Sequence, residues 1–453
     1  MIGAAGPLPN AGRAGGKVGG WWFTLFTLAW LVIWTAQLTP LQLLLPLQLD
    51  TPDSAAGWVS GVVSSGLVLG VGGLAGVVAG PIAGALSDRG RSTRPGPRRR
   101  PWALGGVWLA AICLVLTGIS HGPWLVGASW VGVSIGIATA SAAFTAMIAD
   151  QLPAAQRGAA SSAIGSSQAL GIVLGVGAVV LLGLGVLAGY LVLAGAIALV
   201  GTATALLLPD PAAEGAAASQ VSAAGIETPG PIDPEPLAAV PTTRGLLASL
   251  ADRDFRWMLI GRLVVNIGNA LGTALLLFFL LYGIGQPHAS AEENLLLLIV
   301  VYTLFVVLAS IGVGIASDRL GRRRALTVAC AVIQATAGVV ILLSPTFGMT
   351  MVAAALMGIG YGGFSTVGLA FATDLLPSSR DNARDLGIVS VTASLGQLLG
   401  PVIGAGLVAL VGAFWLLFLG ATVLSFVGAC LTALARETRV RPSAIAATGT
   451  LTT

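Results

Sequence analysis

The sequence predicts an all-α integral membrane protein with twelve transmembrane helices, arranged as two pseudo-symmetric six-helix bundles. Three observations lead to this fold class. The chain of 453 residues is 56% hydrophobic and only 9% charged, whereas soluble domains contain roughly 25% charged residues. Its apolar residues form twelve runs of the length that a membrane-spanning helix needs, about 20 residues. Two polar motifs recur at matching places in the two halves of the chain.

The apolar runs of the first half lie at 21–47, 58–86, 102–120, 124–149, 160–182 and 185–208. The first run follows Arg13 and Lys17 as a signal peptide would, but it is too long for a cleaved signal and a second span follows it. We therefore expect it to be retained. The fifth and sixth runs are separated only by glycines such as Gly183 and Gly185, without a charge. The runs of the second half lie at 257–282, 295–317, 325–344, 348–374, 386–410 and 413–435.

Composition divides the chain into five segments. Between the two sets of runs, residues 209–256 are rich in Pro, Ala, Glu and Asp, which is typical of a polar linker. This linker is too short and too polar to form an enzyme domain, so we expect no enzymatic activity. The predicted segments are an N-terminal tail (1–20), an N-terminal bundle (21–208), the linker (209–256), a C-terminal bundle (257–435) and a C-terminal tail (436–453).

The basic residues indicate orientation. Six arginines lie between Arg89 and Arg100, in the loop after the second run, and Lys and Arg are concentrated on the cytoplasmic side of membrane proteins. If both termini are cytoplasmic, every Lys and Arg except Arg262 falls on the inner side. The pattern predicts a multi-pass protein of the cytoplasmic (plasma) membrane. The net charge of +4 sits in short clusters between spans, which excludes a nucleic-acid surface.

The three cysteines, Cys113, Cys330 and Cys430, all lie in apolar runs and have no metal-ligand spacing. They are typical of small buried hydrophobic residues. We expect neither a metal nor a cofactor, and we expect the protein to act as a monomer surrounded by membrane lipid.

Two motifs are repeated. Gly84-Ala-Leu-Ser-Asp88-Arg89, followed by arginines, returns in the second half as Gly314-Ile-Ala-Ser-Asp318-Arg319. Asp150, followed by Pro153 and Arg157, returns as Asp374, followed by Pro377 and Arg380. The first motif follows the second run of each half and the other motif ends the fourth. The chain therefore consists of two six-helix units of similar plan.

The Gly-x-x-x-Asp-Arg-x-Gly-Arg-Arg pattern from Gly314 to Arg323 resembles the signature loop of the major facilitator superfamily, and the first copy differs by an insertion after Arg89. The resemblance, with twelve spans in two halves, covers nearly the whole chain. It implies a secondary transporter that moves a small solute by rocking of its two bundles, with the solute site near the membrane midplane.

In this interpretation the two signature loops form a cytoplasmic latch. Each aspartate can pair with a neighbouring arginine or cap the start of a helix of the opposite half, and Gly84 and Gly314 allow close helix approach. The alternative is that these charges only orient the protein. The residues assigned to the latch are Gly84, Asp88, Arg89, Gly314, Asp318, Arg319, Arg322, Arg323, Asp150, Arg157, Asp374 and Arg380.

Two finer resemblances concern the substrate. The loop from Asp88 to Arg98-Arg99-Arg100-Pro101-Trp102 resembles that of the glycoside and sucrose symporter branch, which implies import of a sugar or glycoside coupled to a proton or sodium. Gly396-Gln-Leu-Leu-Gly400-Pro401 resembles the bend that drug antiporters carry in their fifth helix, but here it lies in the eleventh. Export of amphipathic compounds is therefore the second hypothesis. A membrane receptor or scaffold without flux is the third.

A proton symporter usually carries a carboxylate within a span, and no run has one near its middle. Asp150 and Asp374 end their runs near the inner surface. An ion pair with Arg157 or Arg380 is the more economical interpretation for them. Asp150 is the candidate proton carrier if the transport is proton-coupled, and otherwise the protein is a uniporter.

Polar and aromatic residues within spans are candidates for the solute site. Arg262 lies about six residues into the seventh run, roughly 9 Å along the helix, and shares a face with Asn266 and Asn269. It either faces a water-filled cavity or reaches to the cytoplasmic surface. Trp34 and Gln37 share a face of the first helix and suit stacking on a sugar ring. The candidate lining residues are Trp30, Trp34, Gln37, Arg262, Asn266, Asn269, Tyr361 and Gln397.

Overall fold

The computed structural model describes residues 18–51, 57–89, 99–210, 252–375 and 382–436. Within these ranges the chain is helical and contains no strand. Eleven helices are long and apolar enough to cross a membrane, and a bent helix pair completes twelve. The predicted fold class is confirmed: the chain is a multi-pass membrane protein of two six-helix bundles.

The first bundle has six spans, and its first and last contain a short π-helical turn. The first span is α1 (Gly20–Thr39), η1 (Pro40–Leu44) and α2 (Leu45–Leu49). The sixth is α7 (Val186–Ala196), η3 (Ile197–Gly201) and α8 (Thr202–Leu207). Between them lie α3 (Trp58–Arg89), α4 (Arg100–Ile119), α5 (Pro123–Gln151) and α6 (Ala154–Leu181).

The second bundle repeats this plan. Its first span is broken: α11 (Arg253–Ala274) is followed by α12 (Leu276–Phe278) and η5 (Phe279–Gly283), with a bend of 45°. The remaining spans are α13 (His288–Leu320), α14 (Arg323–Leu343), α15 (Phe347–Asp374), α16 (Asn382–Val411) and α17 (Trp415–Leu434).

The predicted spans differ from these helices mostly at their ends. The weak break between the fifth and sixth spans is a turn at Gly183, which has φ +61°, a conformation that glycine adopts without strain. The bend in the seventh span was not predicted. There Leu275 leaves the helical region, with φ −111° and ψ 21°, and the hydroxyl of Thr273 bonds back to the Asn269 carbonyl.

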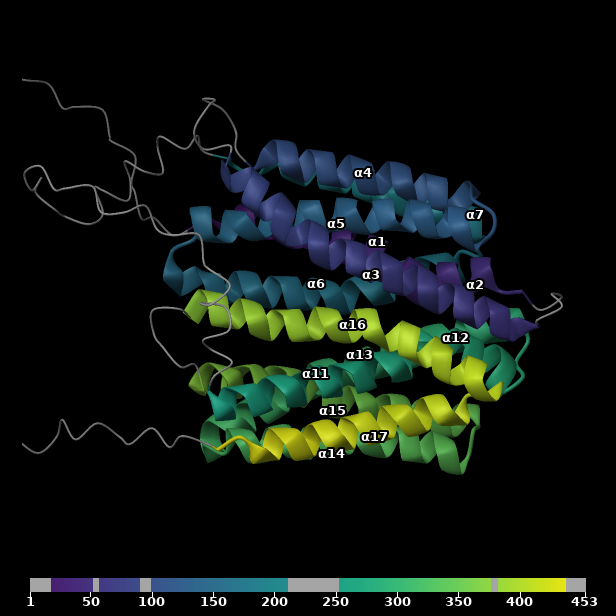
Figure 1. The fold of residues 1–453 in the computed structure, drawn as a ribbon. Coiled ribbons are helices and arrows are strands. Elements are labelled where there is room, and N and C mark those ends of the chain that lie inside the picture. Colours follow the sequence, from purple (N-terminus) through teal and green to yellow (C-terminus); the bar gives the residue numbers. More distant parts are fainter. Residues whose placement is uncertain (1–17, 52–56, 90–98, 211–251, 376–381, 437–453) are drawn as a thin grey trace, which may run out of the picture.

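The two bundles lie side by side, with the purple-to-blue helices in the upper part of Figure 1 and the green-to-yellow helices in the lower part. They meet along two helix pairs, α3 with α16 and α6 with α13. We call the end of the molecule that carries Arg99 and Arg323 the arginine-rich end, and the opposite end, where α2 and η5 finish, the far end.

The bundles are packed together toward the far end. Leu277, Leu281 and Leu295 of the second bundle belong to the hydrophobic core of the first, and Val62 of the first belongs to a core of the second. Toward the arginine-rich end α3 has open space beside it, since no described atom lies within 4 Å of a side chain built at Gly80 or Gly84. The structure is therefore closed at the far end.

Glycines bring helices into close contact at equivalent places of the two bundles. A Cβ added at Gly136 in α5 would lie 2.5 Å from the Ala110 nitrogen in α4. A Cβ added at Gly360, the equivalent position in α15, would lie 2.6 Å from the Gln334 nitrogen in α14. In lipid the hydrophobic effect does not drive helices together, and small residues allow the close van der Waals packing that holds them in contact. The internal repeat predicted from the motifs thus extends to helix packing.

Two adjacent glycines of α4 test this packing. We expect Gly106→Ala to lower the free energy of unfolding by about 1–3 kcal/mol, because its Cβ would lie 2.5 Å from the Ala140 nitrogen. Gly105→Ala is the matched control, since no described atom lies within 4 Å of its Cβ. Thermal unfolding in detergent measures both. Equal unfolding temperatures of the two variants would contradict the proposed packing.

Candidate functional site

A cavity lies between the two bundles. The first bundle contributes Leu38 and Gln42 from the first span, with Gly165, Gln168, Ala169 and Ile172 from α6. The second bundle supplies the larger part of the wall, from α11 to α17. Its polar lining residues are Asn269, Thr273, Tyr302, Thr303, Gln334, Thr350, Tyr361, Gln397 and Ser425.

The π-helical turn η1 positions Gln42. Pro40 has no N–H and cannot continue the regular bonding of α1, and the Leu45 nitrogen donates to the Pro40 carbonyl instead, across five residues. Such a turn shifts the helical face by one residue, and π-bulges are frequent at functional sites. Gln42 therefore lines the cavity while its neighbours Leu43 and Leu44 are fully buried.

Hydrogen bonds orient the amides of the opposite wall. The Tyr302 hydroxyl donates to Asn269 Oδ1 at 3.2 Å, so the Asn269 Nδ2 group remains as a donor. Gln334 donates from Nε2 to the Val265 carbonyl at 3.2 Å and to Ser425 Oγ at 2.9 Å. A carbonyl only accepts, so it fixes which end of the Gln334 amide is nitrogen. Both side chains are held in one orientation.

Three glutamines complete the polar lining. Gln42, Gln168 and Gln397 line the cavity and have no hydrogen bond to any described residue, so each offers an N–H₂ group and a carbonyl oxygen. No Asp, Glu, Lys, Arg or His is among the described lining residues. Apolar groups such as Met357 and Phe418 alternate with these amides. The cavity can thus bind a neutral solute that has both hydrogen-bonding and apolar surfaces.

The structure brings three of the predicted lining residues together: Asn269, Tyr361 and Gln397 all line the cavity. It places Trp30, Trp34 and Gln37 elsewhere. Trp30 is 6% exposed and packs between Phe26 and Trp34 in the core of the first bundle. Trp34 packs within its own bundle, where Gly171 of α6 lies against it. The residues of this span that line the cavity, Leu38 and Gln42, lie further along the chain.

Arg262 lies deeper than the sequence indicates, because α11 begins at Arg253. Nine residues of helix correspond to roughly 13.5 Å. Its guanidinium lies 5.9 Å from the Phe364 ring centroid. Nε and Nη1 are enclosed without a hydrogen-bond partner among the described residues. Arg262 does not line the cavity, and Asn266 connects the two: its Nδ2 donates to the Arg262 carbonyl, and its Oδ1 faces the Tyr361 hydroxyl at 3.5 Å.

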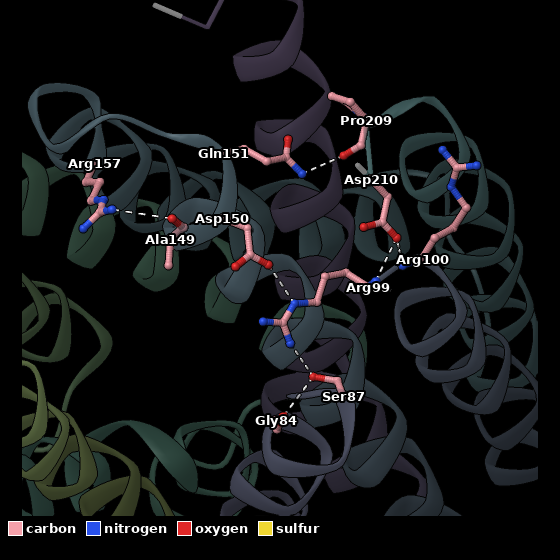
Figure 2. A network of polar contacts seen from close by, with 10 residues as sticks. All are labelled: Gly84, Ser87, Arg99, Arg100, Ala149, Asp150, Gln151, Arg157, Pro209 and Asp210. Atoms are coloured by element: carbon pink, nitrogen blue, oxygen red, sulfur yellow. Dashed lines mark hydrogen bonds and ion pairs between the residues drawn. The ribbon is translucent and has the colours of Figure 1, made fainter. Parts of the chain in front are cut away.

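A second polar site, at the arginine-rich end of the first bundle, is centred on Arg99 (Figure 2). Arg99 Nε donates to Asp150 Oδ2 at 2.9 Å, and Nη1 donates to the Ser87 hydroxyl at 2.6 Å. The Arg99 side chain is 6% exposed. It therefore ties the start of α4 to the ends of α3 and α5.

Helix ends are capped at the same site. The backbone nitrogens of Arg99 and Arg100 donate to Asp210 Oδ2 at 2.8 and 2.7 Å, which satisfies the free N–H groups at the start of α4. The Arg100 guanidinium donates to the Ala205 and Leu208 carbonyls at the end of α8. A cation at a helix C-terminus is favourable.

The second bundle repeats these roles. Arg323 donates to Asp374 Oδ1 at 2.7 Å, and Arg324 donates to the Ala435 carbonyl after α17. Arg323 and Arg324 follow Arg99 and Arg100 at the same spacing at which Asp374 follows Asp150. The Arg323–Asp374 pair is more exposed to solvent than the Arg99–Asp150 pair, since the side chains of Arg323 and Asp374 are 31% and 33% exposed.

Several expectations about the latch residues are corrected. Asp150 pairs with Arg99 and not with Arg157, which instead bonds the Leu152 and Ala149 carbonyls, because Arg99 reaches the Asp150 carboxylate from the start of α4. Arg380 lies outside the described residues. Asp374 pairs with Arg323, a residue of the predicted latch, whereas Arg380 was the partner expected for it.

Close helix approach at Gly84 and Gly314 is absent from this conformation. No described atom is within 4 Å of a Cβ at Gly84, and at Gly314 the nearest is a Thr366 methyl at 3.7 Å. Asp318 is 78% exposed and lies 3.9 Å from Arg323 of its own bundle, and Arg319 and Arg322 are exposed. The structure describes no side chains for Asp88 and Arg89.

Sequence reasoning missed Arg99, Gln168, Tyr302 and Gln334 as site residues. Arg99 had a signal, since its spacing from Arg323 equals that of Asp150 from Asp374. Gln168, Tyr302 and Gln334 are single polar residues in apolar runs, and only the three-dimensional structure shows which side of each helix faces the cavity.

A family model described as Major Facilitator Superfamily matches residues 7–176, 91–298 and 262–451. Similar solved structures include a mutant of the nucleoside transporter NupG (TM-score 0.69, 15% identity, 91% of this chain and 98% of that chain). They also include a D-xylose-proton symporter (TM-score 0.65, 14% identity, 92% of this chain and 98% of that chain). A third is a bacterial homolog of the human lysosomal transporter Spinster, in an inward-facing and unoccupied conformation (TM-score 0.63, 15% identity, 92% of this chain and 96% of that chain). No curated protein matches the chain.

The two arginine–aspartate pairs differ in burial and should differ in stability contribution. Asp150→Asn leaves the enclosed Arg99 without its counter-charge, so we expect a loss of about 1–3 kcal/mol. Asp374→Asn, in the more exposed pair, should lose about 0–1 kcal/mol. Thermal unfolding of both variants in the same detergent measures the difference. A loss for Asp374→Asn as large as that for Asp150→Asn would overturn this assignment.

Proposed function

Since the chain belongs to the Major Facilitator Superfamily, we propose that it is a secondary transporter that carries a small neutral polar solute, a sugar or glycoside, through the cavity between its bundles. The observation that carries this proposal is the lining: free amides, tyrosines and hydroxyls without a charged side chain among the described residues. Hydroxyl groups of a sugar both donate and accept, which suits amides that present one donor and one acceptor group each.

Two of the structural neighbours support the choice of solute class. Their names describe a nucleoside transporter and a xylose-proton symporter, and nucleosides and xylose are neutral solutes that carry several hydroxyls. The extended arginine loop after α3, which resembles that of glycoside symporters, points the same way. The proposed direction is import into the cell.

The proposed mechanism is alternating access by rocking of the two bundles. The bundles pack at the far end, so the cavity is proposed to open toward the arginine-rich end, which the positive-inside rule places in the cytoplasm together with both termini. The signature loops would pair across the bundles only in the opposite state. Exposed Asp318, with Arg323 of its own bundle 3.9 Å away, is consistent with an open latch.

Within each bundle the arginine–aspartate pair keeps the helix ends together while the bundles move. Arg99 and Arg323 each bind a carboxylate of their own bundle, so these contacts need not break during rocking. Asp150 is bonded to Arg99 in this way, which argues against it as the carrier of a coupled proton. The proposed transport is coupled to a proton or to sodium, because the arginine-rich loop resembles that of glycoside symporters.

Export of an amphipathic compound is the second candidate. The apolar part of the lining, which includes Met357, Phe418 and Ile172, favours it. A flexible Met can adapt to varied apolar ligands. The class of solute that the protein exchanges distinguishes the two candidates.

The test of the proposed function is solute counterflow in proteoliposomes. Vesicles loaded with unlabelled sugars or glycosides should exchange them for labelled ones, without any ion gradient. Transport of lipophilic cations only would favour the exporter. Counterflow with neither class, in protein that is folded and correctly inserted, would contradict transport and favour a receptor or scaffold.

Tyr302→Phe should weaken solute binding without removing transport. The variant keeps the ring but loses the bond that orients Asn269, so we expect KM to rise about fivefold with kcat nearly unchanged, as for the loss of one hydrogen bond. Tyr190→Phe is the control, because that buried hydroxyl has no partner among the described residues and does not line the cavity. An unchanged KM for Tyr302→Phe would remove this pair from the site.

Arg262→Ala tests whether the isolated guanidinium takes part in transport. Because Arg262 lies beside the cavity and not in its wall, we expect the KM for neutral solutes to change less than twofold while the rate of exchange falls. Counterflow kinetics separate the two effects. A rise in KM as large as that of Tyr302→Phe would place Arg262 in the solute site instead.

A further inference from the structure

Hydrogen bonds that cross between the two bundles meet at Asp50, at the far end of the first span. The Tyr282 hydroxyl of η5 lies 2.8 and 2.9 Å from the two Asp50 carboxylate oxygens. His288 Nε2, at the start of α13, lies 3.1 Å from Oδ2. The Asp50 side chain is 5% exposed. Residue 50 belongs to the first bundle and both partners belong to the second.

An aromatic stack crosses the same boundary. The Trp58 ring of α3 lies between Tyr282, with centroids 5.1 Å apart at 11°, and Phe414, at 5.2 Å and 15°. Tyr282 therefore takes part in both contacts. The junction lies between the cavity and the far-side water. The cavity can therefore open to the far side only if these contacts separate.

Separation would release a carboxylate that is held by donors on the other bundle. A buried polar group that loses its partner is unfavourable unless water replaces it, so the bonds to Asp50 stabilise the closed state. A neutral imidazole donates one hydrogen bond to the carboxylate, and an imidazolium adds the attraction between opposite charges to that bond.

We propose that Asp50, Tyr282 and His288 form the gate at the far end, and that a proton taken up by His288 from the far-side water strengthens it. The proposal rests on the transport function argued above. The His288 side chain is 56% exposed, so the proton can reach it without passing the gate. An imidazole ordinarily gains a proton near pH 6.5.

The charged and titratable groups around His288 favour this direction. Asp50 faces it from the first span, and Glu292, one turn further along α13, interacts with it electrostatically. Tyr282 faces it from η5 as a neutral donor to Asp50. Trp58 of α3 contributes only its ring. Of these two carboxylates only Asp50 lies on the opposite bundle, so a positive charge on His288 adds attraction across the junction between the bundles. Acidification of the far side therefore favours the closed gate, and neutral or alkaline pH favours opening.

The test measures the gate directly, without a solute. Spin labels are placed at His121→Cys, in the loop between α4 and α5, and at Pro345→Cys, between α14 and α15. Both positions are exposed at the far end of different bundles. The three native cysteines are replaced by alanine, and distance distributions are recorded in lipid nanodiscs from about pH 8 to pH 5.5, on both sides of the ordinary imidazole pKa.

We expect the ratio of short to long distances to rise about fivefold on acidification. In His288→Gln, which keeps a donor but does not titrate, the ratio should not respond to pH. In Asp50→Asn the long distances should dominate at every pH. Glu293→Gln is the control, because Glu293 is an acidic residue of the same helix turn and should retain the native response.

If the gate is almost always closed, the population of long distances is too small to measure. Tyr282→Phe raises that population, because it removes one hydrogen bond to Asp50 and leaves His288 in place. The pH response should persist in this variant and disappear when His288→Gln is added. An equal pH response with and without His288, or unchanged distances in Asp50→Asn, would overturn the proposal. Failure of solute counterflow would contradict the transport function and leave these distances unaffected, so the two failures are distinguishable.

Discussion

The exclusion of charge from hydrocarbon is the constraint on which this structure depends. An ionised side chain in the middle of a membrane is unfavourable by roughly 2.5–3.5 kcal/mol even on the mildest scale. Among the residues that the structure describes, nearly all charged side chains except Arg262 lie toward the two ends of the bundles. At one end Arg99 pairs with Asp150, and at the other Asp50 accepts hydrogen bonds from Tyr282 and lies 3.1 Å from His288. The cavity between is lined by neutral amides and tyrosines. The polar groups of this protein are thus mostly paired charges at the ends or uncharged groups in the cavity.

The pairs at the two ends differ in the elements that they join. At the arginine-rich end each arginine binds a carboxylate of its own bundle, in both copies of the repeat. At the far end the Asp50 contacts join one bundle to the other. Contacts within a bundle keep it rigid, whereas contacts between bundles decide which end is closed. Two rigid bodies with a breakable junction are what rocking requires.

Much of the fold was predictable because its signals are long and redundant. Each span is a long apolar run, and the repeat of Asp88 and Asp318 indicates two equal halves. The site was less predictable because its signals are single residues. Asn269 and Tyr361 were identified as polar residues within spans, but Trp30 and Trp34 were assigned to the cavity from helical spacing alone. Spacing shows which residues share a face, and only tertiary packing shows what that face contacts.

The ion-pair partners of the charged residues could not be predicted from the sequence either. Asp150 was expected to pair with the nearby Arg157, yet Arg99 binds it, because the start of α4 lies beside the end of α5 in space. Arg99 was one of six arginines in a single loop, and nothing local distinguishes it from its neighbours. Its equivalence to Arg323 becomes informative only once the internal repeat is applied to every polar residue and not to the motifs alone.

Alternating access requires that one cavity opens in turn to the two sides of the membrane. Thr303 lines this cavity, and Thr303→Cys in a background without the native cysteines can be labelled with a membrane-impermeant maleimide in proteoliposomes of known orientation. We expect labelling from both sides, and we expect labelling from the far side to be suppressed when cysteines that replace Trp58 and Phe414 are cross-linked. Labelling from the arginine-rich side alone, with no effect of the cross-link, would contradict alternating access.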